Sequence, residues 1–136
     1  MRKYWIVMAM LLAPAVQAQN FTTAAEVKPI LGMTKGNWVA VREYAGKDHI
    51  YFSHLAAWRC GLDTVHYGLN GAAADTEFEF QPCHIDTATP NAILGDGVLP
   101  FFTAPLNSVE TITVRVTYDD GTEETETFER KSVLIP

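Results

Sequence analysis

Between Trp58 and Gly71 the chain reads WRCGLDTVHYGLNG, which places a cysteine, an aspartate, a histidine and a tyrosine within fourteen residues. Side chains of these types ligate metals or carry out redox and acid–base chemistry. The only other cysteine is Cys83, and its distance along the chain differs from the Cys-x-x-Cys spacing of thiol oxidoreductases. We therefore predict that Cys60 and Cys83 form a structural disulfide that adds about 3 kcal/mol of stability.

The four histidines are the second candidates, because imidazole is a common transition-metal ligand. Two histidines on one strand or helix usually ligate together when they stand at i, i+2 or at i, i+4. None of the four has such a spacing. We expect no metal and no cofactor, and keep as the alternative a periplasmic transition-metal-binding protein that uses His54, His66 and His84.

Hydrolytic chemistry and calcium binding find weaker support in the sequence. None of the serines of the mature chain, Ser53, Ser108 and Ser132, lies in a Gly-x-Ser-x-Gly motif. Asp63 with Glu79 is a carboxylate pair of the kind that cleaves glycosides. The acidic stretch DDGTEE (119–124) lacks the spacing of an EF-hand, and GDG (95–97) is typical of a turn. We expect a protein that is not an enzyme, with a small cell-wall hydrolase as the second alternative.

Aromatic and arginine side chains are concentrated in one region of the chain. Tyr, Trp and Arg dominate binding hot spots because they combine a large contact area with a polar tip. The function we expect is therefore a non-catalytic binding or accessory module that presents an aromatic and arginine face to a protein or glycan partner. The predicted binding residues are Trp38, Arg42, Tyr44, Tyr51, Trp58 and Arg59.

The first eighteen residues have the layout of a secretory signal peptide. Arg2 and Lys3 precede an apolar run from Tyr4 to Ala13, and small residues lead to a predicted cut after Ala18. The apolar run is too short to span a bilayer, so we expect no transmembrane anchor after processing. Residues 19–136 then form a single disulfide-clasped β domain, located in the periplasm or secreted.

The charge of the mature chain narrows the class of partner. Removal of Arg2 and Lys3 takes the formal net charge from −6 to −8. Binding of a phosphate backbone depends on Lys and Arg that neutralise its charge, so nucleic acid is not expected as a partner.

The patterns of the mature chain predict one helix followed by strands. Thr23 and Glu26 form a capping box at the start of a helix over 24–33. Alternating runs predict a hairpin over 37–55 with Gly46 and Lys47 at its tip, and a second over 64–81 whose two ends the disulfide joins. The segment 84–108 is expected to be a long connection that includes a short edge strand.

The last hairpin, over 109–136, allows two registers. A two-residue tip pairs Arg115 with Glu126 and turns Phe128 to the polar side. A three-residue tip with Gly121 in a bulge puts Phe128 beside Ile112, but sets acidic residues on the apolar face.

Six or seven short strands with one short N-terminal helix predict a mainly β, all-β fold. We expect a small β-sandwich of immunoglobulin-like size, with a small open β-barrel as the alternative.

Overall fold

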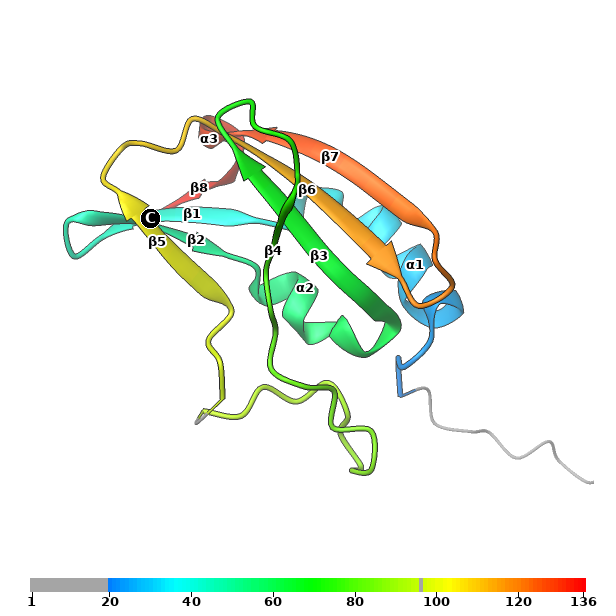
Figure 1. The fold of residues 1–136 in the computed structure, drawn as a ribbon. Coiled ribbons are helices and arrows are strands. Elements are labelled where there is room, and N and C mark those ends of the chain that lie inside the picture. Colours follow the sequence, from blue (N-terminus) through cyan, green and yellow to red (C-terminus); the bar gives the residue numbers. More distant parts are fainter. Residues whose placement is uncertain (1–19, 96) are drawn as a thin grey trace, which may run out of the picture.

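The computed structural model describes residues 20–95 and 97–136, and the predicted signal peptide lies outside them (Figure 1). The described chain is mainly β, and its strands form two four-stranded sheets. Sheet A has the strand order β5-β2-β1-β8, and sheet B has the order β4-β3-β6-β7. The β class is confirmed, whereas these strand orders do not confirm an immunoglobulin sandwich. Within the described segments, no helix has the length and hydrophobicity needed to cross a membrane.

Sheet A is built from β1 (Ala40–Tyr44), β2 (Lys47–Tyr51), β5 (Phe101–Pro105) and β8 (Leu134–Ile135). The first two strands form the predicted hairpin, but its tip is Ala45–Gly46 instead of Gly46–Lys47. Both tip residues have positive φ, 52° and 74°, as a two-residue turn between twisted strands requires. The displacement of the tip shifts the pairing by two positions and leaves the predicted faces unchanged.

The second strand of the hairpin ends earlier than predicted, at Tyr51 instead of residue 55. Residues Ser53–Ala57 form the short helix α2, and η2 (Arg59–Gly61) follows it. Phe52, Leu55 and Ala56 are the buried residues here, which is a helical spacing and not the alternation of a strand.

Sheet B contains β3 (Leu62–Leu69), β4 (Thr76–Glu77), β6 (Thr111–Tyr118) and β7 (Glu123–Glu129). Strand β4 is shorter than predicted, although Phe78 and Phe80 beyond it still pack against the core. In the β6–β7 hairpin Ile112 pairs with Phe128, so the register with the three-residue tip is the one adopted.

This register places Glu124 and Glu126 on the inner face of sheet B, where each carboxylate has a partner. Tyr118 donates its hydroxyl to Glu124 at 3.2 Å, and Lys35 forms an ion pair with Glu126 at 2.9 Å. Burial and the carboxylates of Glu124 and Asp120 raise the pKa of Tyr118, which therefore stays a donor. The two unfavourable glutamates of the register are thus compensated, one by a tyrosine of the same hairpin and the other by a lysine far away in the sequence.

Helix α1 (Ala24–Met33) and the turn η1 (Lys35–Asn37) that follows it cover the inner face of sheet B beside β7. The helix has the predicted bounds, and Thr23 caps it by accepting a hydrogen bond from the amide of Glu26. Val27 and Leu31 are fully buried in the core. Sheet A covers the rest of the inner face, where the rings of Tyr67 and Phe102 stack with centroids 4.5 Å apart. One core therefore joins both sheets and the helix.

A buried ion pair ties the C-terminal segment to sheet A. Arg130, the first residue of α3 (Arg130–Val133), donates two hydrogen bonds to Asp48, at 2.6 and 2.9 Å. The amides of Asn107 and Val109 donate to the same carboxylate. Asp48 is completely buried, and Arg130 together with these amides lowers its pKa to about 2.

Candidate functional site

The six predicted binding residues fall into two groups in the structure. Trp38, Trp58 and Arg59 lie inside or against the core, whereas Arg42, Tyr44 and Tyr51 lie on the outer face of sheet A. Only the second group is placed to meet a partner.

Trp38 belongs to the core and not to a binding face. Its side chain is fully buried, and its indole N–H donates to the carbonyl of Leu31 at 3.0 Å. The strand β1 begins two residues later, so the alternation that placed Trp38 beside Arg42 does not reach it. Trp58 is partly buried and meets the ring of Phe21 edge to face, with centroids 4.9 Å apart.

Arg59 is a structural residue next to the disulfide. Its guanidinium is buried and makes no ion pair with any described carboxylate. It donates five hydrogen bonds of 2.7–3.0 Å to the backbone carbonyls of Ala56, Gln81, Pro82, Asn91 and Ala92. Burial lowers the pKa of Arg59 from an ordinary value so high that the group stays charged. We call this group of contacts the Arg59 anchor.

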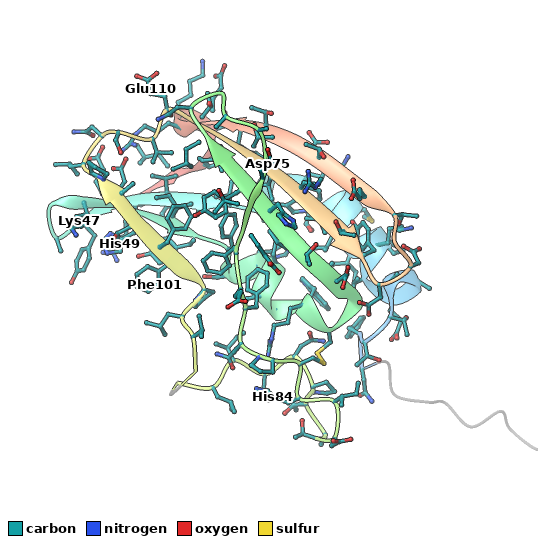
Figure 2. All side chains as sticks on the ribbon, viewed as in Figure 1. Lys47, His49, Asp75, His84, Phe101 and Glu110 are labelled. Carbon is teal, nitrogen blue, oxygen red and sulfur yellow. A yellow bond between two sulfur atoms is a disulfide. The ribbon has the colours of Figure 1, made fainter. Side chains whose placement is uncertain are left out.

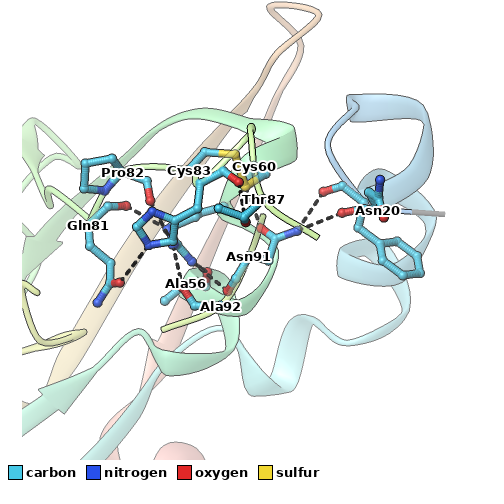
Figure 3. Close-up of a disulfide and its surroundings, with 12 residues drawn as sticks. Asn20, Ala56, Cys60, Gln81, Pro82, Cys83, Thr87, Asn91 and Ala92 are labelled. Carbon is cyan, nitrogen blue, oxygen red and sulfur yellow. Dashed lines mark hydrogen bonds between the residues drawn. A yellow bond between two sulfur atoms is a disulfide. The ribbon is translucent and has the colours of Figure 1, made fainter. Parts of the chain in front are cut away.

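The disulfide reinforces the Arg59 anchor (Figure 3). Cys60 and Cys83 are bonded, as predicted, with their Cα atoms 5.1 Å apart. Asn91 accepts a hydrogen bond from the amide of Cys60 and donates to the carbonyls of Asn20 and Phe21. Together these contacts hold the long connection 84–100 against α2 and the start of the domain.

The outer face of sheet A gathers side chains that the core does not need. Residues paired across antiparallel strands point to the same side of a sheet. Arg42 is paired with His49, Tyr44 with Lys47, and Tyr51 with Phe101, so all six share one face. We call them the cationic aromatic face. Figure 2 shows Lys47, His49 and Phe101 grouped beside β2 and β5, away from Asp75 and His84.

The rings of this face contact one another. His49 lies 5.6 Å from Tyr44, 6.1 Å from Tyr51 and 5.4 Å from Phe101, measured between ring centroids. Arg42 places its guanidinium carbon 4.5 Å from the centre of the Tyr44 ring. None of these aromatic rings packs against the described core, and Tyr44 is 55% exposed.

A hollow of about 470 Å³ adjoins the face. Its lining contains hydrogen-bonding side chains, the two C-terminal residues and no aspartate or glutamate side chain. The lining residues are Asn37, Ala40, Arg42, Tyr51, Ser53, His54, Ile135 and Pro136.

His54 is held in one orientation at this hollow. The Thr34 hydroxyl donates its single hydrogen to the carbonyl of Ile30 at 2.7 Å, so it must accept from Nε2–H of His54 at 2.8 Å. Burial lowers the pKa of His54, which is therefore neutral at neutral pH.

The three histidines of the alternative metal site do not meet. His54 contacts Thr34, His66 lies on sheet B paired with Arg115, and His84 contacts Gln81. Over residues 20–95 and 97–136, no three His, Cys, Asp or Glu side chains are arranged to hold a metal ion. The described residues therefore give this alternative no support, because spacing along the chain does not show which side chains the fold brings together.

The elements of a hydrolase are only partly assembled. Asp63 and Glu79 line a second hollow, of about 520 Å³, and both are exposed. No hydrogen bond joins a serine hydroxyl to a histidine among the described residues. Asp120 in the acidic hairpin tip is already used, since it accepts hydrogen bonds from Thr122 and pairs with Lys28 at 2.9 Å.

His49, Lys47 and Phe101 belong to the face but were not among the predicted binding residues. The predicted tip at Gly46–Lys47 already put His49 on the side of Arg42 and Tyr44, so alternation could have identified it, whereas Lys47 was assigned to the tip itself. Phe101 follows Pro100 and forms the edge strand β5, where a preceding proline is tolerated.

The chain matches no family model, and neither a curated protein nor a solved structure resembles it at a significant level.

Proposed function

We propose that this protein is a small exported module, a β-sandwich of immunoglobulin-like size, that binds a protein or glycan partner without catalysing a reaction. It acts in the periplasm or outside the cell. The binding surface is the cationic aromatic face, with Arg42, Tyr44 and Tyr51 at its centre. The observation that carries the proposal is the contiguity of these rings on the solvent side of sheet A, where no core contact requires them.

Exposed aromatic rings point to binding because they contribute more to binding than to folding. An exposed ring that packs on no core contributes little to folding, since stabilisation by apolar groups follows the area removed from water. The same ring contributes strongly to binding, because it buries its area when a partner arrives and has few rotatable bonds to immobilise.

Export is supported by the basic, apolar and small-residue segments of the first eighteen residues. The Cys60–Cys83 disulfide is compatible with this route, because disulfides persist in oxidising compartments.

The test compares two double variants of the mature protein for retention on a washed cell-envelope fraction. Tyr44→Ala with Tyr51→Ala removes rings from the face. Thr113→Ala with Thr127→Ala is the matched control, because these threonines bond to each other on the outer face of sheet B. We expect the tyrosine variant to lose at least about tenfold in affinity while the control keeps that of the wild type.

Equal retention of all three proteins would refute the proposed face. If the tyrosine variant alone loses retention, treatment of the envelope with protease or with periodate before binding distinguishes a protein partner from a glycan.

A further inference from the structure

The cationic residues of the described chain have partners, with two exceptions. Five of the eight form ion pairs: Lys28, Lys35, Arg115, Arg130 and Lys131. Arg59 is bonded to five carbonyls. Among the described residues, only Arg42 and Lys47 have neither an ion pair nor a set of carbonyl partners. Both lie on the cationic aromatic face.

This lack of pairing stands out because the protein is acidic. The chain has sixteen Asp and Glu against ten Lys and Arg. Yet the outward-facing residues of β1, β2 and β5 include no carboxylate, since Glu43 and Asp48 point to the opposite side, where Arg130 binds them. The adjoining hollow has no acidic side chain either, and the terminal carboxylate of Pro136, which lines it, forms no ion pair with Arg42. The local positive charge therefore complements an anion supplied from outside.

The geometry of Arg42 favours a carboxylate. Its guanidinium lies over the ring of Tyr44, so one flat side is covered. A guanidinium stacked in this way still presents its N–H groups at its edges, and two parallel N–H groups match the two oxygens of a carboxylate.

The surroundings of Arg42 favour a sugar as the carrier of that carboxylate. Neighbouring rings offer a platform for the C–H face of a pyranose, and an open hollow lined by Asn37, Ser53 and His54 offers partners for its hydroxyls. His54 presents a neutral ring there, with Nε2–H already directed to Thr34. A nucleic acid would instead meet an acidic protein with only two free cationic side chains among its described residues.

We infer that the cationic aromatic face and its hollow bind an anionic glycan, with Arg42 holding the carboxylate of a uronic acid unit and Tyr44 and Tyr51 packing against sugar rings. This inference rests on the proposed function and specifies the partner. Lys47 adds longer-range attraction that salt weakens.

The experiment uses calorimetric titration of the mature protein with oligosaccharides of polygalacturonate, alginate and hyaluronan, each beside its methyl ester. The ester keeps the ring and removes the charge. We expect at least one acid to bind about tenfold or more tightly than its ester, and binding of that acid to weaken as salt is raised.

The variants assign the preference to Arg42. Arg42→Gln should bind the acid as weakly as wild type binds the ester, with affinity for the ester unchanged. Arg42→Lys should keep part of the preference, since it retains charge without the planar fork. Arg115→Gln, on the outer face of sheet B, is the control and should bind as wild type.

Equal binding of acid and ester, equal loss in Arg42→Gln and Arg115→Gln, or no binding of any of the six probes would each overturn the inference. If the envelope experiment still depends on Tyr44 and Tyr51 in that case, the proposed binding function stands and its partner is not a uronic acid glycan. If that dependence is absent as well, the proposed function fails independently.

Discussion

Arg42 and Arg59 stand seventeen positions apart in the chain, and each has tyrosine or tryptophan close to it in sequence. In the fold they have opposite roles. Arg59 is buried, and its five carbonyl partners hold a long loop in place. Arg42 lies against an exposed ring and bonds to no described acidic group. A guanidinium whose hydrogen-bonding capacity is used internally contributes to stability, whereas one that leaves it free is available to a partner.

The same division separates the aromatic residues. Trp38 fills the space between α1 and sheet B, while Tyr44 and Tyr51 cover nothing in the described core. Substitutions should therefore sort into large effects on folding for the inner group and large effects on binding for the outer group. The predictions below test that separation.

The largest effect on stability is expected at Trp38. Replacement by alanine removes a completely buried ring and the shorter of two hydrogen bonds to the carbonyl of Leu31, so Trp38→Ala should lower the free energy of unfolding by about 4 kcal/mol. Chemical denaturation followed by circular dichroism measures this. A loss below about 1 kcal/mol would mean that the ring does not support the core and would erase the contrast with Tyr44.

The Arg59 anchor should have the next largest effect. Arg59→Met leaves buried carbonyls unpaired and should cost about 3 kcal/mol, with faster proteolysis within residues 84–100. Limited proteolysis with mass spectrometry locates the cleavage sites. Arg42→Met is the matched control and should leave the cleavage pattern unchanged; similar cleavage in both variants would contradict the assignment of roles.

Acid should weaken the ion pair between Asp48 and Arg130 only at low pH. The pKa of Asp48 is about 2 in the folded protein and about 3.9 in an unfolded chain, so its contribution of about 2 kcal/mol is complete above pH 4 and is lost as the pH falls toward 2. Carboxyl-carbon NMR during a pH titration reports this group directly. A midpoint above about 3.5 would show that Arg130 does not hold the carboxylate as the structure indicates.

The smallest effect on stability is expected on the outer face. Arg42→Gln and Tyr44→Ala should each change the free energy of unfolding by less than about 0.5 kcal/mol, because neither side chain is packed in the core. Thermal unfolding of these two variants, measured alongside Trp38→Ala and Arg59→Met, compares the stability of the outer and inner groups. Destabilisation above about 1.5 kcal/mol would reassign the face to folding and weaken the case for binding.

Local patterns anticipated a large part of the fold. The bounds of α1 followed from its capping box, the disulfide from the two cysteines, and the faces of β1 and β2 from alternation. Each of these depends on neighbours along the chain or on the absence of any other partner. Only three of the six predicted binding residues lie on the candidate site, because residue type and proximity in sequence do not distinguish a buried ring from an exposed one.

By itself the sequence determined the β class, the clasp between Cys60 and Cys83, and which residues of each strand share a side, since these follow from chain periodicity and residue chemistry. Tertiary structure decided the rest. The register that puts Glu124 and Glu126 inward depends on Lys35 and Tyr118, and the pairing of β5 with β2 brings Phe101 to His49. The contacts of Lys35 with Glu126 and of Phe101 with His49 join segments far apart along the chain, so their energies enter only when the sheets and α1 assemble around one core.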